Sequence, residues 1–135
     1  SGWTYLSPHA AATGADAHYI ATEKRRQLQL IHQRRAQYTP IRPPLEVARR
    51  IVIVVDDGLA TGATMAAALH SLRQRKPARL ICAVPVASHE ALALVRPLAD
   101  EVACLQAPQD FEAVGQYYED FTQVEDDEVI HILSK

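Results

Sequence analysis

The sequence contains no stretch of about 18 consecutive apolar residues, so we expect no membrane-spanning helix and no membrane partner. It does not open with the basic and then apolar pattern of a secretory signal. It has only two cysteines, Cys82 and Cys104, and each lies in an apolar run. This placement favours buried free thiols of a reducing compartment over a disulfide, and no cysteine and histidine spacing is typical of zinc. We therefore expect a cytoplasmic protein.

Strong net charge is also missing. The sequence has 14 basic and 16 acidic residues, a net charge of −2, so we expect no nucleic-acid partner. The charges are nevertheless uneven, with basic residues early in the chain and acidic residues at its end. Solvated helix faces explain this distribution best, and a basic surface that faces polyphosphate or RNA is the alternative.

At 135 residues with 48% hydrophobic content, the chain is long enough for one domain with a core. We divide this domain into an atypical N-terminal segment (1–16), a basic helix with a proline-rich loop (17–50), a core of strands and helices (51–106), and a C-terminal loop and helix (107–135). In the first segment we expect a short strand at 3–6 and a short helix that starts at Ser7-Pro8 and ends near Gly14. Asp16 is the expected N-cap of a helix over 17–38, and 39–44 is irregular because of its three prolines.

Strand and helix patterns then alternate. We expect strands at 51–55, 79–84 and 101–105, helices at about 63–74 and 89–98 (the second capped by Ser88), and a last helix at about 126–133. This order predicts an α/β fold, a Rossmann-like parallel sheet with right-handed crossovers. The first two strands are continuous apolar runs, which predicts burial on both faces. Ligands of such sheets bind at the carboxyl ends of the strands.

The most informative stretch, residues 51–64, lies at such an end. An apolar strand leads to Asp56 and Asp57, then to a loop of small residues and threonine, and then to a helix. Backbone N–H groups at a helix N-terminus suit phosphate, and neighbouring carboxylates suit sugar hydroxyls, so the pattern predicts a ligand such as ribose 5-phosphate. No lysine follows Gly62, as a P-loop requires, and the glycine spacing differs from that of a dinucleotide fingerprint. An ordinary strand, turn and helix with a chance acidic pair is the alternative.

This stretch resembles the phosphoribosyl-pyrophosphate (PRPP) motif of type I phosphoribosyltransferases: a hydrophobic strand, two acidic residues and a T-G-x-T-type turn. Several further segments are similar to a bacterial group of this family. They are residues 57–65, 83–87 and 114–121, together with Arg34-Arg35, Tyr38 and residues 42–44. Some members of that group are fused to an α/β-hydrolase domain. The resemblance covers residues 17–135.

The resemblance implies the type I phosphoribosyltransferase fold and transfer of a phosphoribosyl group from PRPP to a nitrogenous base, with Mg²⁺ as cofactor and pyrophosphate as the second product. It implies that the catalytic residues Asp56 and Asp57 hold the ribose hydroxyls, directly or through Mg²⁺. It assigns the 5-phosphate to the loop formed by Gly58, Leu59, Ala60, Thr61, Gly62, Ala63 and Thr64. Which base accepts the group stays open.

The sequence departs from the family in one respect. It has no Gly-Gly, Lys-Gly or Arg-Gly dipeptide that could form the pyrophosphate-binding turn of the family's earlier half. The chain therefore resembles a C-terminal part without the N-terminal strands, and we expect it to pair with that missing part or to form a homo-oligomer. A non-catalytic module that binds PRPP or a nucleotide, such as a regulator, is the alternative function.

Three further side chains are candidates for ligand contacts. Arg42 precedes the motif strand and is a candidate for pyrophosphate, and Phe111 or Tyr117 could stack on the base. For the two aromatic residues, packing within the protein is the favoured interpretation.

Overall fold

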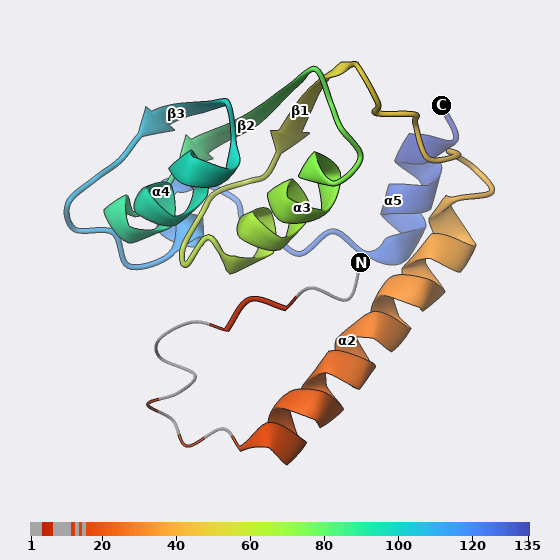
Figure 1. The fold of residues 1–135 in the computed structure, drawn as a ribbon, viewed down its shortest axis with the longest axis horizontal. Coiled ribbons are helices and arrows are strands. Elements are labelled where there is room, and N and C mark those ends of the chain that lie inside the picture. Colours follow the sequence, from red (N-terminus) through yellow and green to blue (C-terminus); the bar gives the residue numbers. More distant parts are fainter. Residues whose placement is uncertain (1–3, 7–11, 13, 15) are drawn as a thin grey trace. The chain divides into compact units, whose positions relative to one another are not determined.

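The computed structural model describes residues 4–6, 12, 14 and 16–135. They belong to two compact units (Figure 1). The sheet unit contains residues 4–5 and 46–121, and the helical unit contains the described residues among 6–45 together with 122–135. Residues 4–6 form no strand, so the prediction of a strand there is wrong for them. The short helix expected between Ser7 and Gly14 lies largely outside the described residues. The single domain stays a prediction.

The sheet unit has the predicted alternation of strands and helices. Its strands are β1 (Ile51–Val55), β2 (Arg79–Val86) and β3 (Glu101–Gln106), in the order β1-β2-β3 and all parallel. Helix α3 (Ala63–Arg73) connects the first pair, and α4 (His89–Val95) with a 3-10 turn (Arg96–Leu98) connects the second (Figure 1). Because a parallel pair needs a crossover between its strands, the short connections and the strand order together confirm the predicted α/β fold.

The core lies between one face of the sheet and helices α3 and α4. Leu80, Cys82 and Val84 of β2 are buried on this face, and they form one cluster with residues of both helices, among them Leu69 and Leu92. Cys82 is a free thiol whose pKa is raised by burial, and Cys104 is a half-buried free thiol. One apolar layer therefore holds the strands and helices of this unit together.

The opposite face of β1 is open, which corrects the prediction that this strand is buried on both faces. Ile51, Ile53 and Val55 are 66%, 59% and 72% exposed, and Leu105 of β3 is 84% exposed. A continuous apolar run is typical of strands covered on both faces. Here α3 and α4 pack against the same face, and β1 is an edge strand of the sheet. The run of apolar residues could not show which face is covered.

The helical unit contains α2 (Ala17–Tyr38) and α5 (Asp126–Leu133). The predicted cap is confirmed, because the Asp16 carboxylate accepts a hydrogen bond of 2.7 Å from the Tyr19 N–H. The Tyr38 hydroxyl donates a hydrogen bond to the Asp126 carboxylate, and that bond raises the pKa of Tyr38. This bond between Tyr38 and Asp126 joins the two helices, and α2 buries none of its side chains.

Across the described residues, no helix combines the length and apolar character needed to cross a membrane.

Because the core lies on one face of the sheet, substitution of two different leucines should affect the stability of the chain to different extents. Leu69 on α3 is fully buried, whereas Leu105 is 84% exposed. We expect Leu69→Ala to lower the free energy of unfolding by about 2–5 kcal/mol, because it removes buried methyl groups and leaves a cavity. Leu105→Ala should change it by less than about 0.5 kcal/mol. Urea unfolding followed by circular dichroism measures both, and equal losses would contradict the one-sided core.

Candidate functional site

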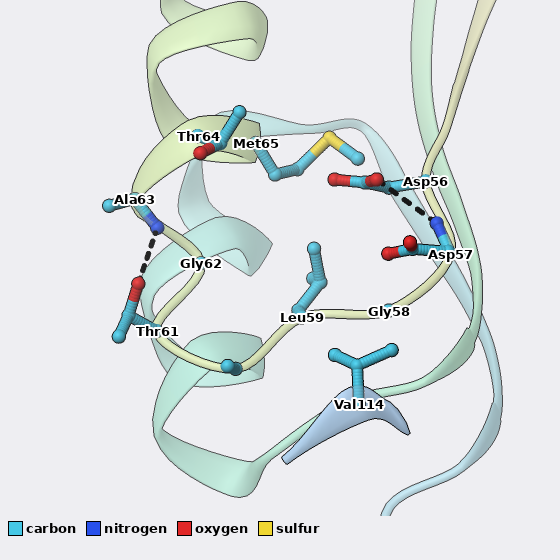
Figure 2. A pocket seen from close by; sticks show the side chains of 11 residues that line it. Asp56, Asp57, Gly58, Leu59, Thr61, Gly62, Ala63, Thr64, Met65 and Val114 are labelled. Atoms are coloured by element: carbon cyan, nitrogen blue, oxygen red, sulfur yellow. Dashed lines mark hydrogen bonds between the residues drawn. The ribbon is translucent and has the colours of Figure 1, made fainter. Parts of the chain in front are cut away.

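A pocket of about 320 Å³ lies where β1 ends and α3 begins (Figure 2). Its walls are formed by the continuous segment from Asp56 to Met65 and by Val114. The structure therefore gathers around one pocket both carboxylates and the whole loop that the sequence singled out. In Figure 2 the two carboxylates point from the end of β1 toward the loop and the start of α3.

The loop is held in place by Leu59, which is 2% exposed. The backbone of Leu59 forms a parallel bridge with Ala87, which extends the pairing of β1 with β2 beyond the end of β1. The Leu59 N–H donates to the Val86 carbonyl at 3.0 Å, and the Leu59 carbonyl accepts from the Ser88 N–H at 2.9 Å. The Ser88 hydroxyl donates to the Ala60 carbonyl at 2.7 Å and accepts from the Ala91 N–H at 3.0 Å, so the predicted cap of α4 is confirmed. The same serine thus caps one helix and fixes the loop that precedes the other.

Two glycines allow the backbone to take this path. A Cβ on Gly58 would lie 2.7 Å from a methyl carbon of Val114 and 3.0 Å from one of Val86. Gly62 has a φ of +76°, a left-handed conformation that glycine adopts without steric cost, and it lies against Ala91. The loop therefore depends on glycine at both positions, at one for space and at the other for backbone conformation.

The turn into α3 presents unpaired backbone donors. The N–H groups of Ala60, Thr61, Gly62 and Thr64 have no hydrogen-bond acceptor among the described residues. The Ala63 N–H donates to the Thr61 hydroxyl oxygen at 3.3 Å. Donors of this kind at the start of a helix, together with the positive end of the helix dipole, attract anions.

The two carboxylates differ in their surroundings. Asp56 is half-buried, and its Oδ1 accepts a 3.0 Å hydrogen bond from the Asp57 N–H. Burial raises the pKa of Asp56. The hydrogen bond from Asp57 offsets part of this rise, and the negative charge of Asp57 adds to it. Asp57 is exposed, and its carbonyl accepts a 2.6 Å hydrogen bond from the Tyr118 hydroxyl. A cation beside this pair would favour the ionised form of Asp56.

The donor set fits a hard cation. Asp56 and Asp57 offer only oxygen ligands, and within the described part of the chain no group of three or more acidic, histidine or cysteine side chains could hold a metal ion. Mg²⁺ commonly binds through one or two carboxylates and completes its shell with water and substrate phosphate oxygens. Two carboxylates beside unpaired N–H groups are compatible with that arrangement.

The other predicted contact residues do not line this pocket. Arg42 belongs to the helical unit, where its Nε donates to the Leu133 carbonyl at 2.9 Å. Phe111 and Tyr117 stack on each other with ring centroids 5.5 Å apart, which agrees with the packing interpretation. Sequence reasoning missed the roles of Val114 in the pocket wall and of Tyr118 beneath Asp57. The signal for both was the family-like stretch 114–121.

Comparison with known proteins decides the family. The sequence profile described as "Phosphoribosyl transferase domain" matches residues 11–122. This chain belongs to the phosphoribosyltransferase family.

Related proteins agree with this assignment. Two curated relatives, from the CDC 1551 and H37Rv strains of Mycobacterium tuberculosis, are each named "putative phosphoribosyl transferase". Each is 38% identical over 123 residues, or 91% of this chain. A solved crystal structure, that of the protein TT1426 from Thermus thermophilus, is 44% identical, with a TM-score of 0.74 over 98% of this chain. The match spans 28% of the length of each curated relative and 63% of the solved chain.

The raised pKa of Asp56 has a consequence for stability. Ionisation of the Asp56 carboxyl costs more free energy in the folded than in the unfolded chain. The protonated carboxyl therefore contributes stability below the ordinary aspartate pKa, and this contribution is lost as pH rises through the raised pKa of the folded chain. We expect Asp56→Asn to be more stable than the parent near pH 7, because the neutral amide avoids this cost. The gain should disappear at a pH below about 3.9, where the parent carboxyl is protonated in both states.

Asp100→Asn is the control with the opposite sign. The pKa of Asp100 is lowered by its hydrogen bonds with Arg73 and with the Leu80 N–H, so this substitution should destabilise the chain near pH 7. Denaturant unfolding at a series of pH values measures both variants. Destabilisation by Asp56→Asn near pH 7 would refute the assigned cost.

Proposed function

We propose that this chain binds PRPP or a phosphoribosyl nucleotide together with Mg²⁺, and that it takes part in transfer of the phosphoribosyl group to a nitrogenous base with release of pyrophosphate. The observation that carries the proposal is the pairing, around one pocket, of unpaired N–H groups with two carboxylates. The family provides the reaction type, and the pocket provides a matching set of contacts.

The 5-phosphate would occupy the turn into α3. The N–H groups of Ala60, Thr61, Gly62 and Thr64 would each donate to a phosphate oxygen, and the hydroxyls of Thr61 and Thr64 are additional donors. Because Leu59 and Ser88 already hold the loop, little ordering of the backbone is needed when the phosphate binds. A preorganised donor set of this kind favours tight binding.

The ribose hydroxyls would face Asp56 and Asp57, which line the same pocket. These two carboxylates would hold Mg²⁺ directly or through water, and the ion would supply positive charge to the departing pyrophosphate. In the transfer, a base nitrogen forms a bond to C1 of the ribose, the bond from C1 to the pyrophosphate oxygen breaks, and a base proton is released to solvent. The chain contributes mainly by positioning the sugar and by electrostatic stabilisation at the carboxylates.

A second candidate function is binding without transfer, as in a regulatory module. It is favoured by the lining of the pocket, because none of the residues from Asp56 to Met65, nor Val114, is basic. A leaving pyrophosphate carries a large negative charge and is commonly stabilised by lysine, arginine or Mg²⁺. The described residues that line this pocket offer no cationic side chain for that purpose.

Binding is tested by thermal unfolding with PRPP and Mg²⁺. A ligand that binds only the folded chain, present at about a hundred times its Kd, adds about 2.7 kcal/mol of stability, which is readily seen as a rise in Tm. We expect this rise in the parent and its loss in Asp57→Asn. The matched control is Asp110→Asn, a change of the same chemistry at an exposed residue outside the pocket, which should keep the rise. The absence of any rise in the parent would contradict the proposal.

Transfer is tested separately, by release of pyrophosphate from PRPP in the presence of a panel of purine and pyrimidine bases. Release that depends on one base, and that is lost in Asp57→Asn, would support the enzyme. A rise in Tm with PRPP but no pyrophosphate from any base would favour the binding module.

A further inference from the structure

The peptide between Asp57 and Gly58 leads from the two carboxylates to the turn that begins α3 (Figure 2). On either side of this peptide the chain is bonded to β2, through the N–H of Asp56 at 3.4 Å and the N–H of Leu59 at 3.0 Å. Between these two anchors lies a glycine, whose backbone is less restricted than that of any other residue. The position of the Asp57 carboxylate therefore depends on what fixes the peptide that follows it.

Tyr118 bonds to this peptide from a distant part of the sequence. Its hydroxyl donates to the Asp57 carbonyl at 2.6 Å. The Asp57 N–H donates to the Asp56 carboxylate, which is a bond within the acidic pair itself. Among the described residues, Tyr118 is the one residue outside the pair that forms a hydrogen bond with the backbone of Asp57 or Gly58. The Tyr118 hydroxyl is therefore well placed to restrain this part of the loop.

The segment that carries Tyr118 is itself packed against the loop. Val114 lies beside Gly58, where a Cβ would be 2.7 Å from one of the valine methyl carbons (Figure 2). The Tyr118 N–H donates to the Gly115 carbonyl at 3.3 Å, and the rings of Tyr118 and Phe121 are 5.1 Å apart between centroids. A Cβ on Gly115 would lie 2.8 Å from the Phe121 ring, so these residues are closely packed. The hydroxyl of Tyr118 is thus presented to the loop by a side chain that its neighbours hold in place.

We propose that Tyr118 is a positioning residue for the acidic pair. Its hydroxyl fixes the peptide between Asp57 and Gly58, and so holds the Asp57 carboxylate beside that of Asp56, where the two bind the sugar hydroxyls and Mg²⁺. Tyr118 does not line the pocket, so it acts through Asp57. This inference rests on the proposed function, because it assigns to the pair a ligand of that chemistry.

Loss of the hydroxyl should affect only the carboxylate end of the pocket. A peptide freed beside a glycine samples several orientations, which spreads the Asp57 carboxylate over several positions that a ligand must then restrict. The phosphate donors lie beyond Leu59, whose own bonds to Val86 and Ser88 do not involve Tyr118. Because the Tyr118 side chain is 37% exposed, removal of its hydroxyl should leave the fold intact.

Backbone NMR tests the positioning without a ligand. In the parent we expect the amide order parameter of Gly58 to be that of a rigid backbone, about 0.85, and in Tyr118→Phe to fall toward the flexible range below about 0.6. The amide of Leu59 should keep its value. The matched control is Tyr117→Phe, which keeps the stacked ring and removes a buried hydroxyl that has no hydrogen-bond partner among the described residues. A Gly58 amide that stays as rigid in Tyr118→Phe as in the control would overturn the proposal.

Ligand titration of the same three proteins tests the consequence for binding. Tyr118→Phe should bind PRPP with Mg²⁺ about three- to tenfold more weakly than the parent, the range expected for the loss of one hydrogen bond. Inorganic phosphate without Mg²⁺ should bind the parent and Tyr118→Phe equally, because it uses only the N–H groups of the turn into α3. Tyr117→Phe should match the parent with both ligands.

The two titrations separate this inference from the function on which it rests. If the parent binds PRPP and Tyr118→Phe binds it equally well, the role of Tyr118 is refuted and the proposed function stands. If Tyr118→Phe loses affinity for phosphate as much as for PRPP, the substitution disturbs the whole pocket and the positioning role is again refuted. A parent that does not bind PRPP would refute the proposed function, and the role of Tyr118 with it.

Discussion

The candidate site depends on the placement of Leu59. Its side chain is in the core, its N–H donates to the carbonyl of Val86 at the end of β2, and its carbonyl accepts from the Ser88 N–H just beyond that strand. Leu59 lies between the two aspartates and the turn into α3, so this anchor sets the distance between the carboxylates and the phosphate donors. Three other residues help to place the loop. Ser88 donates a hydrogen bond to the Ala60 carbonyl, Gly58 allows close approach to Val114 and Val86, and Gly62 takes the left-handed backbone conformation. The functional part of the loop is thereby connected to the hydrophobic core.

The same loop carries groups that do not favour folding. Asp56 is partly withdrawn from water beside a second carboxylate, and the N–H groups that begin α3 lack acceptors among the residues the structure describes. The first feature costs stability in the free protein and would be relieved by a cation, and the second leaves donors available to a ligand with a phosphate group. This opposition between stability and ligand binding is common at functional sites and distinguishes this loop from an ordinary strand-to-helix connection.

Helices α3 and α4 cover one face of the sheet, and the other face of β1, which is an edge strand in the described part of the chain, is open. The core formed with α3 and α4 uses the inward-facing residues of the strands, and the apolar residues of the other face of β1 remain in contact with solvent. The strand that delivers Asp56 to the site therefore keeps one apolar face in contact with solvent.

The sequence by itself determined the features that depend on local interactions. Its periodicity located β1, α3, β2 and α4. The caps at Asp16 and Ser88 were predictable because a side-chain oxygen bonds to an N–H three residues further on. The motif located every residue of the pocket except Met65 and Val114. Only the tertiary structure decided that one face of β1 is open, that Val114 and Tyr118 reach the loop, and that Arg42 bonds to α5 in the helical unit. These outcomes depend on strand order and on contacts between distant segments, which a local pattern of apolar and polar residues does not specify.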